Sequence, residues 1–186
     1  DSSQKAAHFI QLCNQTDTPI IFLQNVTGFL VGKDFESAGI VKKGSQLINA
    51  VSNSTVPHIT IIIGASYGAG TYAMSGRAYN NRFTFIWPTA KIAVMGPKQI
   101  AGVMSMVRRG AALRKGEKFD EDEDAMIVKA VEEIQEKGSL ALAATGLISD
   151  DGIIDPRDTR TVLGFCLSVV RNKAIEGAKS YGVFRL

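Results

Sequence analysis

The feature that most constrains the fold is a pair of short apolar runs with a helical pattern between them. The runs are Ile20–Leu23 and Ile59–Ile63, and each has the length and composition of a strand buried on both faces of a largely parallel sheet. Apolar residues recur at helical spacing from Val41 to Val51, and this helix is predicted to end near Ser54. Because such a crossover makes the two strands parallel, their carboxyl ends meet on one edge. The sequence therefore predicts an α/β fold with active loops along that edge.

Further elements are predicted toward both ends of the chain. Apolar spacing between Ala6 and Cys13 predicts an opening amphipathic helix of about three turns, with Ser2 or Ser3 as its N-cap. Two more strands and three more helical patterns follow the central region: 83–87 and 92–95 for the strands, and 100–107, 127–134 and 162–169 for the helices. A chain of 186 residues is long enough for one full core, so we predict a single domain.

Composition and charge exclude several classes of protein. The chain carries 21 basic and 18 acidic residues, a net charge of +3, and because these are interleaved, nucleic acid is not an expected partner. Cys13 and Cys166 lie in apolar helical patterns without CxxC spacing, so both are predicted to be reduced core residues rather than disulfide or metal ligands. The longest apolar runs are far shorter than the roughly 20 residues that cross a bilayer, so no membrane association is expected.

A strongly charged segment, 108–124, lies between two of the late helical patterns. It begins with two arginines and ends in Asp-Glu-Asp-Glu-Asp. Acidic residues favour the start of a helix because they complement its positive end. We therefore expect a solvated, mobile segment that leads into a helix, in preference to a metal site built from the carboxylates.

The clearest candidate for chemistry is the small-residue segment that follows the second strand. Residues 64–70 are Gly-Ala-Ser-Tyr-Gly-Ala-Gly, and the pattern becomes helical at Thr71. Small residues allow close backbone approach, and the first amides of a helix have no acceptor within it. The amides of Ala69 and Gly70 are thus predicted to bind an oxyanion, which the helix dipole also favours. Tight packing of helix on sheet, without a ligand, would explain the same glycines.

A second candidate follows the first strand on the same predicted edge. The loop 25–32 contains Gly28 and Gly32, which suggest unusual backbone, and Phe29–Val31, which offer apolar contact. Ligands in open α/β sheets gather outside such strand ends. An ordinary crossover loop with one buried aromatic residue is the alternative.

Other catalytic signatures are missing from the sequence. It has no Gly-x-Ser-x-Gly elbow, no phosphate loop and no metal-ligand spacing. His8 and His58 have no nucleophile beside them, and we expect each to be a surface or capping residue. An enzyme built from this chain would rely on backbone amides and on a base from elsewhere.

Together these segments resemble the carboxyltransferase (beta) subunits of biotin-dependent acyl-CoA carboxylases, and specifically their C-terminal domain. The resemblance covers essentially the whole chain. Five ordered motifs carry it: Phe22–Phe29, Ile63–Gly70, Gly76–Tyr79, Ile86–Pro88 with Val94–Gly96, and Asp150–Arg160. The motifs Gln-Asn-x-Thr-Gly-Phe and Ser-Tyr-Gly-Ala-Gly resemble those of the methylcrotonoyl-CoA branch more than those of the propionyl-CoA branch.

The resemblance implies a crotonase/ClpP-like spiral of ββα units, with two such domains in each full subunit. It implies that acyl-CoA lies largely on the N-terminal domain of a neighbouring subunit, so that the active site forms across an interface in a homo-oligomer. A biotin carboxylase and biotin carrier subunit would be a further partner. By the same resemblance, Ala69 and Gly70 form the oxyanion hole for the ureido oxygen of biotin, while Gly28, Phe29 and Gly68 line the biotin side.

The mechanism implied by the resemblance accounts for the missing acid and base. In the family, carboxybiotin releases carbon dioxide, the biotin anion removes a proton from the acyl-CoA, and the enolate attacks carbon dioxide. Biotin is therefore the expected cofactor and base, and no metal is expected in this domain. The protein would contribute position and electrostatics, with each preorganised amide contributing about 3 to 4 kcal/mol.

Some features depart from the family pattern. The first strand of the domain, upstream of Asp1, is expected to be absent, and Gly96-Pro97 stands where Gly-Gly is common. Residues 1–186 are then a fragment that is inactive alone and, through unpaired backbone and apolar surface, dimerises or aggregates.

Two other functions and two compartments stay open at this point. One alternative is a stand-alone crotonase-like acyl-CoA hydrolase or decarboxylase, and the other is a non-catalytic assembly domain. The expected compartment is the cytoplasm of a bacterium or the mitochondrial matrix of a eukaryote. The length of the acyl chain depends on residues outside this chain.

Overall fold

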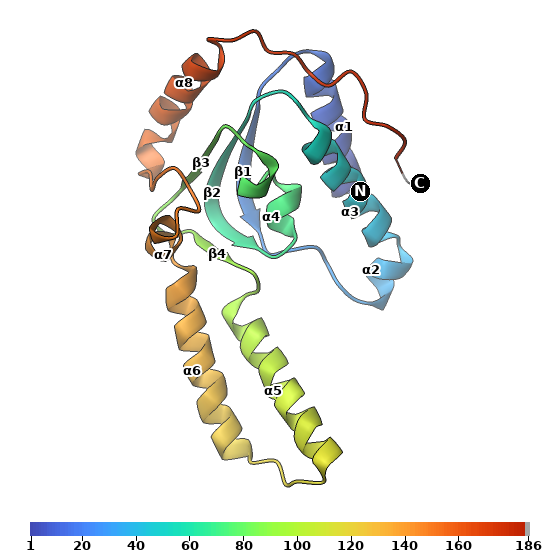
Figure 1. Ribbon diagram of the computed structural model, residues 1–186, viewed down its shortest axis with the longest axis vertical. Coiled ribbons are helices and arrows are strands. Elements are labelled where there is room, and N and C mark those ends of the chain that lie inside the picture. The colour runs from blue at the N-terminus through green and yellow to red at the C-terminus, as the bar shows by residue number, and fades with distance from the viewer. Residues whose placement is uncertain (185–186) are drawn as a thin grey trace.

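A four-stranded parallel sheet forms the centre of the computed structural model, which describes residues 1–184 (Figure 1). Strand β1 (Ile20–Val26) pairs with β2 (His58–Tyr67), and β2 pairs on its other side with β3 (Phe83–Ile86) and, near its end, with β4 (Lys91–Ala93). Every pair is parallel. The predicted α/β class and the crossover between the first two strands are therefore confirmed.

Strand β2 continues four residues beyond its predicted end. Its last residues, Ala65–Tyr67, pair with β4, so part of the small-residue segment is strand rather than turn. The turn itself is reduced to Gly68 and Ala69, and the short helix α4 (Gly70–Ala73) follows at once. The ladder with β4 thus fixes the strand up to the residue before the turn.

Strand β1 is buried on one face only, so the prediction of burial on both faces is wrong. Ile20, Phe22 and Gln24 are buried, whereas Ile21 and Leu23 are 40% and 52% exposed. The physical reason is that β1 is an edge strand of this sheet and helices cover only one of its faces. Self-association of the chain stays a prediction, which this open edge and apolar face support.

Two amphipathic helices, α1 (Ser2–Gln15) and α3 (Ile40–Asn53), pack side by side against the covered face (Figure 1). Helix α3 begins and ends where its pattern predicted, with Ser54 at its C-terminus. The N-cap of α1 is Asp1 rather than a serine, and no side chain caps this end. The main core lies here and consists of buried apolar residues from both helices, β1, the start of β2 and α4: Ala7, Ile10, Cys13, Ile20, Phe22, Leu47, Ala50, Val51, Val56 and Ala73.

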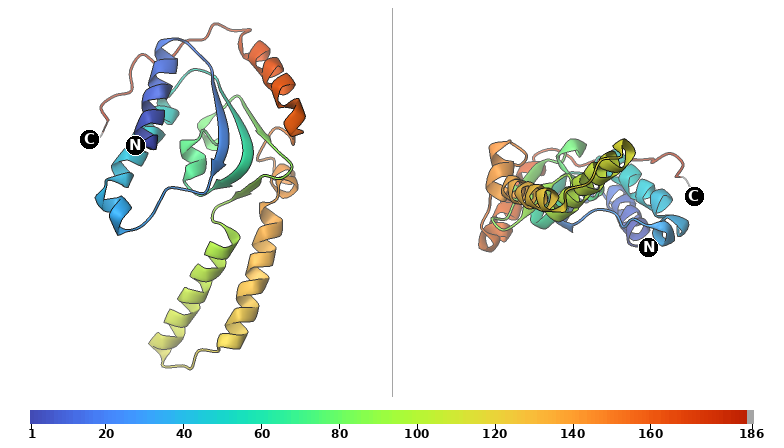
Figure 2. Two further views of the ribbon diagram at one scale, coloured as in Figure 1. Left: turned by 180° about the vertical axis from the view of Figure 1, so that it is seen from behind. Right: turned by 90° about the horizontal axis from the view of Figure 1, so that it is seen from below.

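Helices α5 (Pro97–Lys115) and α6 (Glu121–Ser139) extend away from the sheet as an antiparallel pair, which we call the arm (Figures 1 and 2). After the arm, α7 (Ala141–Gly146) returns to the sheet, and α8 (Thr159–Val170) lies on the side of the sheet away from α1 and α3. The short elements are helix α2 and two 3-10 turns, η1 and η2: Lys33–Ser37, Arg77–Tyr79 and Pro156–Asp158. The end of the chain then crosses back over α1 and α3 (Figure 1).

The charged segment 108–124 is mostly helical, so the prediction of a mobile segment is wrong. Arg108 on α5 donates to the buried carboxylate of Asp124 on α6 at 2.6 Å, and Arg109 pairs with Glu121 at 2.7 Å. These ion pairs join the two helices across the loop. Opposite charges that are separated in the sequence by the loop between the two helices are therefore partners in the fold.

Two of the family motifs meet through an ion pair. Arg77 in η1 donates to the carboxylate of Asp151 at 2.7 Å, and the backbone amide of Thr84 donates to the same oxygen at 2.8 Å. Partial burial opposes ionisation of Asp151, but the hydrogen bonds from Arg77 and Thr84 outweigh it and hold the pKa of this carboxyl below its usual value. The pair fastens the C-terminal region to the sheet.

The cysteines and histidines test three further predictions. Cys13 and Cys166 are free and buried, as predicted. His8 is exposed on α1, whereas His58 is 4% exposed at the start of β2, so the expectation of a surface or capping role is wrong for His58. Its ring lies between the hydroxyls of Ser54 and Ser75 at 2.8 Å each, which satisfy both nitrogens inside the core.

Within residues 1–184, no helix is long and apolar enough to cross a membrane.

Candidate active site

The turn after β2 presents two backbone amides that lack an internal partner. Gly68 adopts a left-handed φ of +58°, and its N–H donates to the carbonyl of Ala93 at 3.1 Å. The N–H of Thr71 donates to the carbonyl of Gly68 at 3.2 Å. Between these two, the amides of Ala69 and Gly70 meet no acceptor in the described part of the chain. They are the two donors that the sequence singled out, whereas the Gly68 amide is already used.

The loop that follows β1 lies directly against this turn. Gly28 has a φ of +111°, a conformation that favours glycine. A Cβ atom added to Gly70 would lie 3.1 Å from the Cα atom and 3.2 Å from the nitrogen of Gly28. The structure therefore brings Gly28 and Gly70 together, and both must stay small because one backbone touches the other.

An apolar pocket of about 360 Å³ opens beside the turn. Phe29 contributes to its wall and packs on Gly44 of α3, where an added Cβ would lie 3.1 Å from the ring. The lining is mostly aliphatic, with Ala69 among it: Phe29, Leu30, Val31, Glu36, Ile40, Val41, Gly44, Ser45, Ile48 and Ala69. A ligand with an apolar body and one oxygen could fill this pocket and reach the free amides.

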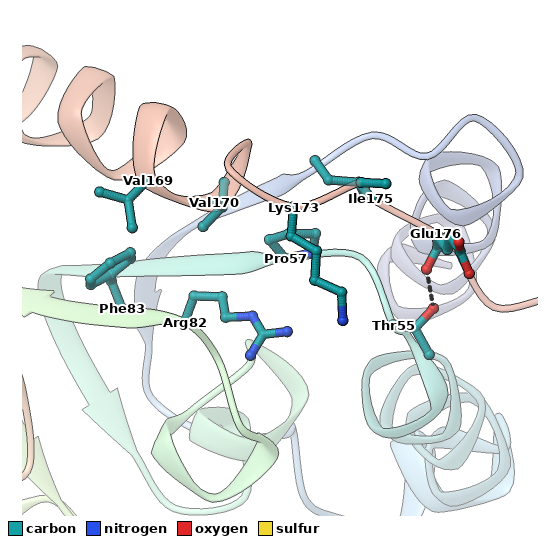
Figure 3. A pocket seen from close by; sticks show the side chains of 10 residues that line it. Thr55, Pro57, Arg82, Phe83, Val169, Val170, Lys173, Ile175 and Glu176 are labelled. Atoms are coloured by element: carbon teal, nitrogen blue, oxygen red, sulfur yellow. Dashed lines mark hydrogen bonds between the residues drawn. The ribbon is translucent and has the colours of Figure 1, made fainter.

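A larger cavity of about 680 Å³ lies elsewhere, between the start of β3 and the end of α8. Figure 3 shows the side chain of Lys173 extending past Pro57 toward that of Arg82. It is at the amino ends of the parallel strands, whereas the turn is at their carboxyl ends. Because ligands of α/β sheets bind at the carboxyl ends, we place the candidate site at the smaller pocket.

The candidate site offers little side-chain chemistry of its own. Its only polar side chains among the lining residues are those of Glu36 and Ser45. No group of three or more metal-ligating side chains occurs within residues 1–184. The arrangement can hold and polarise an oxygen, and it stabilises negative charge there because the donors are fixed in advance.

Two polar residues of β1, Gln24 and Asn25, support this turn, and neither was predicted to have this role. Asn25 accepts from the N–H of Ala65 at 3.0 Å and packs on Gly64. Gln24 is fully buried and bonded to Ser66 and to carbonyls of α4. A glutamine directly after an apolar strand indicates a buried amide that needs hydrogen-bond partners. The sequence alone does not show which residues those partners are.

Replacing Gly70 with alanine tests the close contact at the turn. The new Cβ would lie 2.8 Å from Cγ2 of Val26 and 3.1 Å from the Cα of Gly28, so the loop must move. We expect a loss of about 2 kcal/mol in unfolding free energy, measured by urea denaturation. The control is Gly102→Ala in α5, where no atom lies within 4 Å and a gain of about 0.5 to 1 kcal/mol is expected. Equal effects at both positions would contradict the contact.

The fold and the turn together define a class: an α/β domain with a parallel sheet and two unpartnered backbone amides after a central strand. Comparison with known proteins makes the class specific. Residues 1–184 match the family described as the carboxyl transferase domain. The chain therefore belongs to the carboxyl transferase family.

Relatives and solved structures agree with this assignment. The chain is 58% identical over its full length to a Mycobacterium tuberculosis protein named as a probable biotin-dependent acyl-coenzyme A carboxylase beta2 subunit, of which it covers 35%. It is 48% identical to the mitochondrial methylcrotonoyl-CoA carboxylase beta chain of Arabidopsis thaliana, covering all of the chain and 32% of that protein. The beta subunit of P. aeruginosa geranyl-CoA carboxylase superposes with a TM-score of 0.85 at 40% identity, over 99% of this chain and 35% of that one.

These similarities confirm the crotonase/ClpP-like fold and the resemblance to acyl-CoA carboxylase beta subunits. They also show that the chain spans about a third of the length of these relatives.

Proposed function

We propose that this chain is the biotin-side half of an acyl-CoA carboxyltransferase, and that it helps to move a carboxyl group from carboxybiotin to a methylcrotonoyl-CoA-like substrate. The observation that carries the proposal is the pair of unpartnered amides, Ala69 and Gly70, beside an apolar pocket. Membership of the carboxyl transferase family supports it.

The residues at the turn fit the ureido end of biotin. A ureido oxygen accepts two hydrogen bonds, which is the number of free amides here. Gly28, Phe29 and Gly68 would line the ring, since Gly28 contacts the turn and Phe29 borders the pocket. Bound biotin would supply the carboxyl group and the base that the lining side chains lack.

The chain's own contribution is electrostatic and geometric. The amides of Ala69 and Gly70 would favour the charged form of the oxygen that they hold, and they need no reorganisation as charge develops. The apolar lining would keep water away and so strengthen both hydrogen bonds. The left-handed Gly68 allows the tight turn that precedes both amides.

The remaining parts of the site would come from outside this chain. We propose that residues 1–186 are the C-terminal domain of a longer subunit, because the chain covers about a third of its relatives. The N-terminal domain of a neighbouring subunit would hold the acyl-CoA, and a biotin carboxylase and carrier subunit would deliver biotin within a homo-oligomer. The compartment would be the mitochondrial matrix, in line with the Arabidopsis relative that is named as mitochondrial, or a bacterial cytoplasm.

The test is transfer of a labelled carboxyl group to acyl-CoA by the assembled carboxylase that contains this domain. We expect product only when the biotin-bearing partner is present, and none from residues 1–186 alone. Release of CoA from acyl-CoA without biotin would favour the hydrolase alternative. Undiminished transfer by an assembly that lacks residues 1–186 would leave the chain with an assembly role at most.

A further inference from the structure

A polar network with a fully buried centre joins strands β1 and β2 to the residues that follow the turn. Gln24 of β1 and Ser66 of β2 are both 0% exposed. The Nε2 group of Gln24 donates to the carbonyl of Met74 at 2.7 Å and to that of Thr71 at 3.3 Å. Its Oε1 atom accepts from the hydroxyl of Ser66 at 2.8 Å. One side chain thus links both central strands to helix α4.

The hydrogen bonds fix the direction of every donor in this network. Carbonyl oxygens only accept, so the NH₂ end of Gln24 must face Thr71 and Met74. The single proton of the Ser66 hydroxyl goes to Gln24, so the hydroxyl of Thr71, 2.8 Å from that of Ser66, donates to it. Both amide hydrogens and the Oε1 atom are satisfied. A network without a spare donor has one arrangement and resists displacement.

Helix α4 needs such support because it has only four residues. A single turn of helix is unstable by itself, and the carbonyls at its end have no acceptor role inside it. Gln24 supplies a donor to the carbonyl of Thr71, which also accepts from the N–H of Gly76, and to the carbonyl of Met74, the residue after the helix. The amides of Ala69 and Gly70 immediately precede Thr71, so whatever holds Thr71 also sets where these amides point.

We infer that Gln24, acting through Ser66 and Thr71, is the positioning residue that fixes the two oxyanion amides. The inference rests on the proposed function and concerns the same site. Gln24 is not among the residues that line the pocket, and its hydrogen bonds go to Ser66, Thr71 and Met74. Its effect on chemistry would therefore pass entirely through the geometry of Ala69 and Gly70.

The first test is Gln24→Met in the assembled carboxylase. Methionine keeps the length of the side chain and removes all three hydrogen bonds. We expect kcat to fall about 30-fold with the KM for acyl-CoA unchanged, because displaced donors lose transition-state stabilisation while acyl-CoA is held elsewhere. A purely structural role would instead lower the folded fraction and leave kcat per folded enzyme intact.

The matched control is Thr84→Val, which also removes a buried hydrogen bond. Thr84 lies on β3 and is 2% exposed, and its hydroxyl accepts from the side-chain amide of Asn81 at 2.6 Å. This hydrogen bond does not involve α4. We expect a smaller loss of stability, because one hydrogen bond is removed instead of three, and an unchanged kcat. If Gln24→Met fails to fold, Ser66→Ala is measured in its place, with an expected fall in kcat of about fivefold. This variant removes the hydrogen bonds of the Ser66 hydroxyl to Gln24 and Thr71 and leaves those from Gln24 to the carbonyls of Thr71 and Met74.

A third variant, Gln24→Glu, gives a readout that packing alone cannot produce. An ionised carboxylate would face the carbonyl oxygens of Thr71 and Met74, whereas the protonated acid can still donate to one of them. Burial among acceptors raises the pKa of such a glutamate. We therefore expect the kcat of Gln24→Glu, relative to the unaltered enzyme, to rise as the pH falls.

The outcomes separate the inference from the function on which it rests. Unchanged kcat in Gln24→Met, together with a large loss when an amide at the turn is deleted, would overturn the positioning role alone. Unchanged kcat in both would overturn the oxyanion function itself. Equal losses of kcat in Gln24→Met and Thr84→Val would show a general effect of core damage and would also refute the positioning role.

Discussion

Replacing Ala69 with proline is expected to lower the kcat for carboxyl transfer about 300-fold and to leave the KM for acyl-CoA nearly unchanged. Proline removes one of the two free N–H donors. The φ of Ala69 is −66°, the value that the proline ring imposes, and the residue is exposed. No internal hydrogen bond is lost, because this amide has no acceptor within the described residues. The fall in kcat would therefore measure how much the Ala69 N–H stabilises the oxyanion of the bound ligand.

The control for this variant is Ala69→Gly, which keeps the N–H and is expected to retain activity within about threefold. Proline also restricts the residue before it, and here that residue is the left-handed Gly68. The unfolding free energy of Ala69→Pro is therefore measured alongside its activity. Full activity in a folded Ala69→Pro enzyme, or an equal loss in Ala69→Gly, would contradict the oxyanion role of this amide.

The sheet and its helices could be predicted from local patterns in the sequence. The errors concern features that depend on how distant segments pair and cover one another. Runs of β-branched residues and helical spacing depend only on neighbours along the chain, so the crossover from β1 through α3 to β2 could be predicted. The extension of β2 could not, because Ala65–Tyr67 are strand only through their pairing with β4. The exposed face of β1 was hidden for the same reason, since an apolar run alone does not show whether both faces are covered.

The candidate site divides in the same way. Small residues before a helix predicted the free amides of Ala69 and Gly70 from chemistry that is local to the turn. The role of Gln24 depends on bonds to residues about 40 to 50 positions away. The ion pair of Arg108 with Asp124 depends likewise on two helices that meet through a hairpin. Long-range partners of polar side chains are what the sequence left open.

The second large prediction concerns His58 and acid stability. Burial lowers the pKa of this imidazole from 6.5 to about 4. The ring lies 5.0 Å from that of Phe22, and its two nitrogens lie 2.8 Å from the hydroxyls of Ser54 and Ser75. Asn14 donates to Ser54 at 2.7 Å, so the Ser54 proton is free to point at the ring. The pocket therefore suits the neutral imidazole, and protonation would place an unpaired charge in the core.

The sign of the pH effect follows from the lowered pKa. Below pH 6.5 the unfolded chain binds a proton at His58 that the folded chain refuses until about pH 4. Stability from this residue is complete above about pH 6.5 and declines between pH 6.5 and pH 4, by about 3 kcal/mol in all. Urea unfolding should show a slope near 1.4 kcal/mol per pH unit around pH 5 that His58→Gln abolishes and that His8→Gln, at an exposed position, preserves. A flat profile in the unaltered chain, or the same slope in His58→Gln, would show that the imidazole is not held neutral in the core.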